Sequence, residues 1–274
     1  MKGQGKETLP ATSEGQKTIW RGAAWNLGVT LVLWAYFTLG FVLFFSPFYF
    51  WVYLTQPAPH AAFQRLNHRF FRSFFRLLKW LVPGQKWRIS TEVSEIRSAV
   101  IISNHLSYLD PLLFISLYPR QATIAKSRLF TIPFFGRVVR LSGYLPSKGE
   151  GDYADLMVAG MERLQGLLAS GGNFFVFPEG TRRGTGRLGR LNMGAFKIAR
   201  MLKAPIAVVL IRNTDRLFTP GRFLFNTRED NTIVVDFVDM IHPDYEDPDF
   251  STRLLMDQAA QLLSGAVSAD GLRA

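Results

Sequence analysis

His105 and Asp110 are the first two residues whose types and spacing could do chemistry. A histidine titrates near neutral pH, and a carboxylate beside it can fix its tautomer and stabilise its cation. Such a pair could remove a proton from a bound hydroxyl group as a general base. A plainer interpretation is also open, in which Asp110 only caps a helix and His105 is a solvated loop residue.

A second set of residues, Glu179-Gly180-Thr181-Arg182, follows Pro178 at the end of an apolar run. Gly180 allows the backbone to approach a ligand closely, because glycine has no side chain. Arg182 can bind a phosphate through two parallel hydrogen bonds, and Glu179 can accept hydrogen bonds from ligand hydroxyls. The set suits a phosphorylated polyol, although a surface turn with solvated arginines would have the same composition.

The residues around the first pair predict how its side chains are positioned. Residues 99–102 are apolar and largely β-branched, as a strand buried on both faces requires. Pro111 suits the first position of a helix, with Asp110 as its N-cap. His105 would then lie in the loop beyond the carboxyl end of the strand, where open α/β sheets bind their ligands.

After residue 84, apolar segments typical of buried strands alternate with segments of helical periodicity. This alternation predicts an α/β fold with a mainly parallel sheet flanked by helices. The predicted strands are residues 87–93, 99–102, 121–125, 144–145, 173–177, 205–211 and 232–238. The predicted helices are residues 111–117, 153–169, 194–202 and 250–263.

The region before residue 85 has a different composition. Residues 1–16 are polar and aperiodic, which predicts a flexible tail, whereas residues 23–54 contain no charged side chain. A bilayer span needs about 20 helical residues, so residues 23–54 could form one span or a hairpin bent near Gly40 or Ser46-Pro47. Basic residues on both sides of this run favour a hairpin with both ends in the cytoplasm. A buried helix of a soluble protein is the alternative.

Residues 63–82 have the pattern of an amphipathic helix with one narrow basic stripe and a broad apolar face. This pattern predicts an interfacial helix on a membrane, and the alternative is that the apolar face packs on the rest of the protein. The chain is thus predicted to have a tail (residues 1–16), a membrane-anchoring region (17–84) and an α/β domain (85–274). The basic stripe consists of Arg65, Arg69, Arg72, Arg76 and Lys79.

Composition limits the possible partners and reactions of this 274-residue chain. The formal net charge of +11 indicates an anionic partner, and the apolar face beside the arginine stripe fits lipid better than nucleic acid. The chain contains no cysteine, which excludes disulfides, a thiolate nucleophile and cysteine metal ligands. It also lacks a Gly-x-Ser-x-Gly motif, and His60, His68 and His242 lack metal-ligand spacing. We therefore expect neither a serine hydrolase nor a metal site, and no nucleic-acid partner.

Two motifs resemble those of the glycerolipid acyltransferases, the HxxxxD family typified by 1-acyl-glycerol-3-phosphate acyltransferase. Residues 104–110, Asn-His-Leu-Ser-Tyr-Leu-Asp, are similar to the family's N-H-x-S-x-x-D motif. Residues 177–182, Phe-Pro-Glu-Gly-Thr-Arg, are similar to its F-P-E-G-T-R motif, in the same order along the chain. The resemblance extends over residues 87–239.

The resemblance implies transfer of a fatty acyl group from a coenzyme A or acyl-carrier-protein thioester to a lysophospholipid hydroxyl. The acceptor it favours is 1-acyl-glycerol-3-phosphate, which would give phosphatidic acid by direct attack without an acyl-enzyme. His105 would be the general base and Asp110 its orienting partner. It also implies lipid and thioester partners and no other cofactor. With the basic flanks of residues 23–54, we expect a location on the cytoplasmic face of the inner membrane. The implied substrate-binding residues are Glu179, Gly180, Thr181, Arg182, Lys148, Asn104 and Ser107.

Lys148 departs from the family pattern, because an arginine that helps to bind phosphate usually stands there. Lysine keeps the positive charge but cannot form two parallel hydrogen bonds. The acceptor therefore stays open, with a lyso-ornithine lipid or the remodelling of a lysophospholipid that has a head group as alternatives. A non-enzymatic alternative is a basic membrane-surface binding protein.

Overall fold

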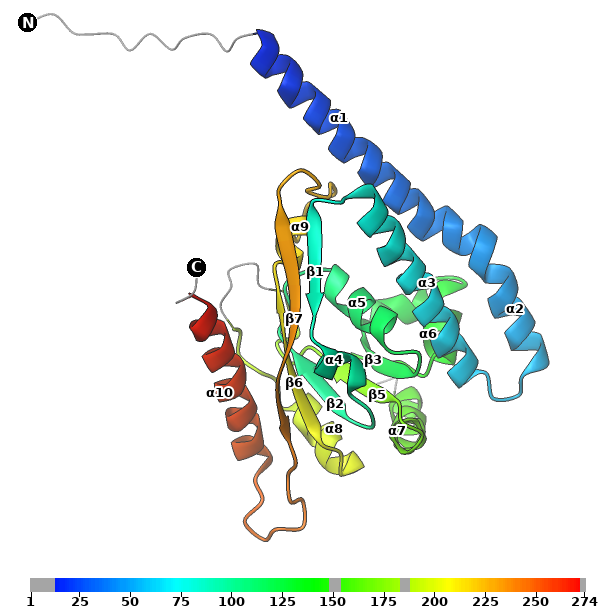
Figure 1. The fold of residues 1–274 in the computed structure, drawn as a ribbon. Helices are drawn as coiled ribbons and strands as arrows, with labels where there is room; N and C mark the ends of the chain where they lie inside the picture. Colours follow the sequence, from blue (N-terminus) through cyan, green and yellow to red (C-terminus); the bar gives the residue numbers. More distant parts are fainter. Residues whose placement is uncertain (1–12, 148–153, 183–187, 272–274) are drawn as a thin grey trace, which may run out of the picture.

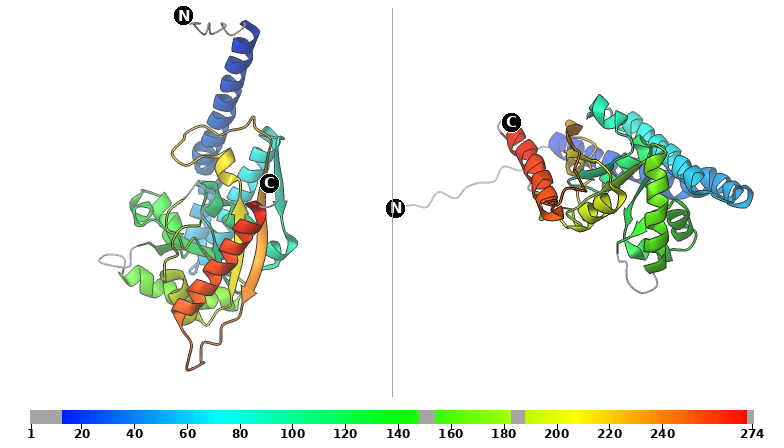
Figure 2. Two further views of the ribbon diagram at one scale, coloured as in Figure 1. Left: turned by 90° about the vertical axis from the view of Figure 1, so that its left-hand side faces the viewer. Right: turned by 90° about the horizontal axis from the view of Figure 1, so that it is seen from below.

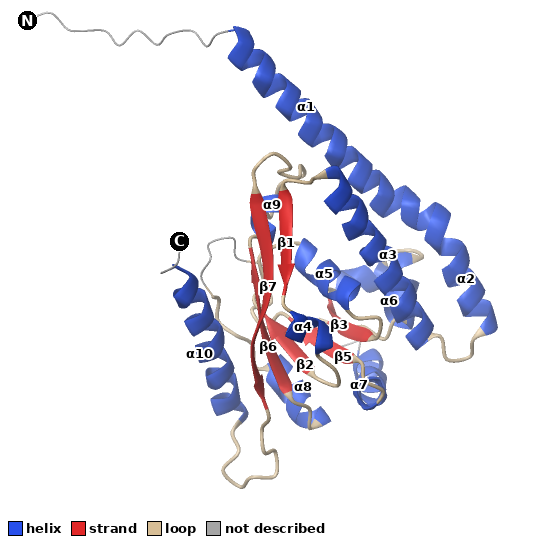
Figure 3. Ribbon diagram, viewed as in Figure 1, coloured by secondary structure: helices blue, strands red, loops and turns tan. Residues whose placement is uncertain are grey.

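The computed structural model describes residues 13–147, 154–182 and 188–271. Among these residues, the strands are β1 (Gln85–Ile89), β2 (Val100–Ser103), β3 (Gln121–Ala125), β4 (Leu145–Pro146), β5 (Asn173–Val176), β6 (Ile206–Arg212) and β7 (Asn231–Ile241). They form one sheet with the order β1-β7-β6-β2-β5-β3-β4 (Figures 1 and 3). Neighbouring strands are parallel except for the antiparallel pair β6 and β7. The predicted α/β fold with a mainly parallel sheet is therefore confirmed.

Helices cover both faces of the sheet. They are α3 (His60–Leu81), α4 (Thr91–Glu95), α5 (Leu109–Leu117), η2 (Ser127–Thr131), α6 (Phe135–Leu141), α7 (Ala154–Ala169), α8 (Gly194–Leu202), α9 (Thr214–Leu217) and α10 (Thr252–Gly271). Side chains alternate across a strand, so Ile101 packs into one core with α3 and α5. Val100 and Ile102 pack into a second core with α7, α8 and α10. The two cores explain why α3 and α10 lie on opposite sides of the sheet (Figures 1 and 2).

Three consecutive segments form the apolar N-terminal region: α1 (Ser13–Ala35), the π-helical η1 (Tyr36–Phe45) and α2 (Ser46–Thr55). They run on as one long helix, of which Gly22–Thr55 is long and apolar enough to cross a membrane (Figure 1). The predicted bend at Gly40 or Ser46-Pro47 is wrong, because the chain turns at residues 56–59 and returns as α3. The Ser46 N–H bonds the carbonyl of Phe41, and Pro47 occupies the first turn of α2, where a missing N–H is tolerated.

Two predicted boundaries differ from those of the structure. Residues 1–12 of the predicted tail lie outside the described residues, and α1 begins at Ser13, inside the range predicted as tail. The strand predicted over residues 87–93 is β1, which ends at Ile89. The chain leaves the sheet there because the Ser90 hydroxyl accepts from the N–H of Val93 and caps the short helix α4.

The amphipathic helix α3 is not interfacial in the sense predicted. Its apolar face packs inside the protein, where the Phe70 ring lies between 5.0 and 6.1 Å from those of Phe37, Phe41 and Phe45 of η1. Phe70 is only 2% exposed. A helix with one apolar face has the same sequence pattern whether lipid or protein covers that face. The basic stripe, by contrast, is exposed, as predicted: Arg65, Arg69, Arg72, Arg76 and Lys79.

The large apolar surface that remains exposed lies on α1, η1 and α2. A contiguous apolar surface of this extent is typical of contact with a membrane or another apolar partner. This surface, rather than the apolar face of α3, is therefore the one suited to lipid. Its exposed side chains are Trp25, Leu27, Leu31, Val32, Leu39, Val42, Leu43, Phe44, Phe48, Phe50, Trp51, Tyr53 and Leu54.

Candidate active site

Three neighbouring parallel strands place the predicted site residues at one edge of the sheet. β2 lies between β5 and β6 and is parallel to both, so the carboxyl ends of the three strands meet at this edge. The loop after β2 contains His105, the loop after β5 contains Arg182, and β6 leads into Thr214. The two sets of residues found in the sequence come together for this reason.

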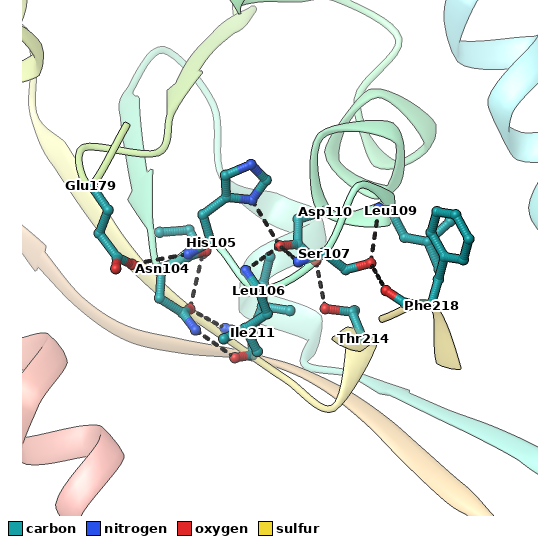
Figure 4. Close-up of polar contacts among 11 residues, drawn as sticks. Asn104, His105, Leu106, Ser107, Leu109, Asp110, Glu179, Ile211, Thr214 and Phe218 are labelled. Atoms are coloured by element: carbon teal, nitrogen blue, oxygen red, sulfur yellow. Dashed lines mark hydrogen bonds and ion pairs between the residues drawn. The ribbon is translucent and has the colours of Figure 1, made fainter. Parts of the chain in front are cut away.

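His105 and Asp110 face one another within the loop after β2 (Figure 4). Nδ1 of His105 lies 2.9 Å from Oδ2 of Asp110. An ionised carboxylate can only accept, so the ring donates from Nδ1 and keeps a lone pair on Nε2. Phe177 stacks on the imidazole with a distance of 4.4 Å between the ring centroids. This arrangement fixes the orientation of the ring and leaves Nε2 able to accept a proton.

Asp110 is fully buried and accepts four hydrogen bonds (Figure 4). Besides His105, the backbone N–H groups of Leu106 and Ser107 donate to Oδ2 at 2.6 and 2.7 Å. The hydroxyl of Thr214 donates to Oδ1 at 2.6 Å. The predicted N-cap role is wrong, because α5 begins at Leu109 and the carboxylate bonds back to the preceding loop. Asp110 thus holds the loop and the histidine ring in one geometry.

The side chains of Asn104 and Ser107 hold the loop after β2 in place. The Asn104 amide donates to the carbonyl of Ile211 and accepts from its N–H, both at 2.8 Å. The buried Ser107 hydroxyl donates to the carbonyl of Phe218 at 2.7 Å. These bonds tie the loop to β6 and to the segment after α9. Both residues were predicted to bind substrate, but the geometry gives them positioning roles instead.

Glu179 joins the loops after β2 and β5. Its Oε1 accepts from the N–H of His105 at 3.1 Å, and its Oε2 accepts from the N–H of Gly189 at 2.7 Å. The side chain is buried, and both of its oxygens accept from backbone groups. The sequence had instead predicted that this carboxylate faces a ligand. The next residue, Gly180, has a φ of +68°, a conformation that glycine adopts without strain, and Thr181 is exposed.

Arg182 lies over the ring of Tyr108, with 3.2 Å between the guanidinium carbon and the ring centroid. Tyr108 belongs to the loop after β2, so this contact brings the two motifs together. A hydrogen bond from Arg182 and its positive charge lower the pKa of the Tyr108 phenol. Nη1 of Arg182 is buried without a hydrogen-bond partner among the described residues. It is a free donor suited to an anionic oxygen.

His105 and Arg182 line one pocket of about 350 Å³. Most of its wall is apolar and comes from α3, α5, α6 and η1, including Phe37 and Phe41 of the long N-terminal helix. Lys126 also lines it. The pocket therefore combines a histidine, cationic side chains and an apolar wall that the N-terminal helix helps to build.

Several residues at the site lie outside the predicted set. Lys126 and Arg128 line the pocket, and Thr214 bonds Asp110. Lys126 directly follows the predicted strand 121–125, so the strand-end rule that located His105 could have found it. Lys148, which was predicted to bind substrate, lies outside the described residues. Among those described, no group of three or more His, Asp or Glu side chains could hold a metal ion.

The fold and the site together define an α/β protein with a histidine–carboxylate pair at the sheet edge and a cationic, largely apolar pocket. A family model described as Acyltransferase matches residues 86–212, which contain both motifs. This match and the names of similar proteins confirm the resemblance of the two motifs to those of the glycerolipid acyltransferases.

Similar proteins match parts of the chain or its overall fold. The chloroplastic 1-acyl-sn-glycerol-3-phosphate acyltransferase BAT2 of Brassica napus is 34% identical over 122 residues, 44% of this chain and 35% of that protein. The 1-acyl-sn-glycerol-3-phosphate acyltransferase of Saccharomyces cerevisiae is 31% identical over 160 residues, 57% of this chain and 52% of that protein. The chain thus spans between 35% and 52% of the length of these two relatives.

A solved structure extends the likeness to nearly the whole chain. The crystal structure of the 1-acyl-sn-glycerophosphate (LPA) acyltransferase PlsC from Thermotoga maritima matches with a TM-score of 0.68. The match covers 91% of this chain and 98% of that one, at 21% sequence identity. It shows that the two proteins share a fold.

Proposed function

We propose that this protein transfers a fatty acyl group from an acyl thioester to the free hydroxyl of 1-acyl-glycerol-3-phosphate, which gives phosphatidic acid. The observation that carries the proposal is that His105 and Arg182 line one largely apolar pocket. A hydroxyl acceptor needs a base, a phosphate needs a cation, and an acyl chain needs an apolar wall. The names of the curated relatives support the same reaction.

In the proposed reaction His105 acts as the general base. Nε2 takes the proton of the acceptor hydroxyl while the hydroxyl oxygen attacks the thioester carbonyl carbon. The carbon–sulfur bond then breaks, and the imidazolium returns the proton to the departing thiolate, so an ester and a thiol are formed. Asp110 stabilises the imidazolium through Nδ1. Ser107 is buried and bonded to Phe218, which supports direct attack instead of an acyl-enzyme.

The acceptor phosphate is proposed to bind among the cations of the pocket. Arg182, Lys126 and Arg128 all line it, and Nη1 of Arg182 has no partner among the described residues. A phosphate oxygen would satisfy this buried donor with a charge-assisted hydrogen bond. The donor thioester is proposed to be that of coenzyme A or an acyl-carrier protein, with no other cofactor.

The site is proposed to work at the cytoplasmic face of the inner membrane. The exposed apolar side of α1, η1 and α2 would contact the acyl region, and these segments also supply Phe37 and Phe41 to the pocket wall. The exposed arginines of α3 would contact anionic head groups, where each basic residue contributes about 1 kcal/mol.

An assay of one purified preparation tests this function. We expect acyl transfer to 1-acyl-glycerol-3-phosphate in a panel that includes a lyso-ornithine lipid and head-group lysophospholipids, each offered with acyl-coenzyme A and with acyl-carrier protein. His105→Ala should abolish transfer while vesicle binding persists, and His242→Ala, at an exposed histidine after β7, should leave transfer unchanged. Vesicle binding without transfer to any acceptor would instead identify a membrane-surface binding protein.

A further inference from the structure

The segment between α9 and β7 exposes two large apolar side chains at its tip. In this segment, residues 218–230, Phe223 is 57% and Leu224 is 42% exposed. Arg222 and Arg228 near them are also exposed. Neither apolar side chain is buried in the core of the domain, and neither lines the pocket. Exposed aromatic and aliphatic residues beside arginines have the composition of a lipid-water interface element.

This segment is attached firmly to the long N-terminal helix. The ring of Phe223 stacks on Trp34 of α1 with 5.9 Å between ring centroids and 6° between ring planes. The N–H of Phe225 donates to the fully buried hydroxyl of Thr30 at 3.0 Å. The hydroxyl of Thr227 donates to the side-chain oxygen of Asn26. Asn26 and Thr30, two polar side chains of α1, thus bind this segment.

The exposed tip continues the exposed apolar surface of α1. Leu27 and Leu31 precede Trp34 by seven and three residues, so they lie on the same side of the helix as Trp34. Both are about half exposed, at 45% and 51%. Phe223 stacks on Trp34 and therefore lies on the same side of α1 as these two leucines, so an apolar medium that covers this side of the helix also reaches Phe223.

We propose that Phe223 and Leu224 form a second lipid contact of this protein and enter the interfacial layer of the bilayer beside α1. The proposal rests on the membrane association included in the proposed function. The occupant is a lipid bilayer rather than a protein, because the tip is continuous with the apolar side of α1 and is flanked by arginines that suit anionic head groups.

The same segment also reaches the active site. Phe218 at its start accepts the hydrogen bond of Ser107, and its ring lies 6.0 Å from that of Tyr108 and 4.4 Å from that of Phe225. The lipid contact at Phe223 and Leu224 is therefore connected, through side chains in contact, to the loop that holds His105 and Asp110.

The absence of native cysteines allows a direct test. Three full-length variants, each with one fluorophore-labelled cysteine, are reconstituted into phosphatidylethanolamine–phosphatidylglycerol vesicles, with or without lipids that have a spin label in the acyl chain. Leu224→Cys probes the tip and preserves the Phe223–Trp34 stack. Trp51→Cys probes the exposed side of α2, and Leu254→Cys probes α10 on the other side of the sheet.

We expect the spin-labelled lipid to cause a loss of fluorescence at residue 224 that approaches the loss at residue 51, with no loss at residue 254. Quenching at residue 51 alone would overturn the second lipid contact while leaving the membrane association intact. Quenching at neither 51 nor 224 would overturn both. Equal quenching at 224 and 254 would also overturn the proposal, because the contact would not be specific to the tip.

Discussion

Replacing Thr214 by valine tests whether a side chain outside the pocket supports the proposed general base. The Thr214 hydroxyl donates to Oδ1 of Asp110 at 2.6 Å and is fully buried. It lies on the side of Asp110 away from the His105 ring (Figure 4). Valine keeps the branched shape but removes the donor, so one oxygen of a buried carboxylate loses its partner.

The size of the effect follows from the bonds that remain. A hydrogen bond to a charged group contributes about 1.5–3 kcal/mol. Oδ2 of Asp110 keeps its three donors, so we expect a loss of about 1.5 kcal/mol, which corresponds to about a tenfold lower kcat for acyl transfer. Because Thr214 does not line the pocket, KM for the acceptor should stay unchanged.

Steady-state kinetics of matched variants measure this effect. Thr214→Ser keeps a hydroxyl donor and should retain most of the wild-type kcat. Ser116→Ala removes another buried hydroxyl, which bonds the carbonyl of Leu113 on the same helix α5 at 2.7 Å, and should leave kcat unchanged. A thermal unfolding curve of each variant establishes that it is folded under assay conditions.

Three outcomes would refute the reasoning. A wild-type kcat in Thr214→Val would mean that the fourth hydrogen bond to Asp110 is dispensable. An equal loss in the valine and serine variants would mean that packing at residue 214 matters and the hydroxyl does not. A rise in KM with unchanged kcat would place Thr214 in acceptor binding, against the geometry.

Two further predictions follow from buried polar groups. Glu179→Gln places an amide NH₂ against a backbone N–H, so kcat should fall for every acceptor tested alike; a rise in KM for phosphorylated acceptors alone would instead indicate substrate contact. Burial, together with the charges of Arg72 and Arg69, lowers the pKa of His68 below 6.5. As the pH falls, the His68 side chain is therefore protonated more readily in the unfolded chain than in the folded protein, which favours unfolding. We expect the unfolding free energy, measured by denaturant titration, to fall as pH drops from about 7.5 to 5.5. In His68→Gln this fall should be less steep.

The strands and their order along the chain are predictable because their signals are local. Residues 99–102 are apolar on both faces, a pattern typical of a central strand in a sheet covered on both sides. The rule that ligands bind at the carboxyl ends of parallel strands then places His105 and Arg182 at one edge. These two steps require no knowledge of which strands are neighbours.

The contacts that complete the site depend on strand neighbours, which local patterns do not determine. Thr214 meets Asp110 across 104 positions because β6 pairs with β2. Glu179 meets the His105 backbone because β5 pairs with the other side of β2. From sequence alone, a carboxylate next to Gly180 could accept hydrogen bonds either from a ligand or from the backbone of another loop. The pairing of β5 with β2 brings the His105 N–H to Glu179 and so favours the second role.

The long N-terminal helix contributes to the pocket and to the outer surface at the same time. Phe37 and Phe41 of η1 point inward and line the pocket, whereas Leu39, Val42 and Leu43 of the same ten-residue segment are exposed. If η1 lies against lipid as proposed, this one helix contacts the bilayer on one side and the pocket lined by His105 on the other. An acyl chain could then remain in apolar surroundings from the membrane to the reacting hydroxyl, which avoids the cost of about 0.8 kcal/mol for each CH₂ group exposed to water.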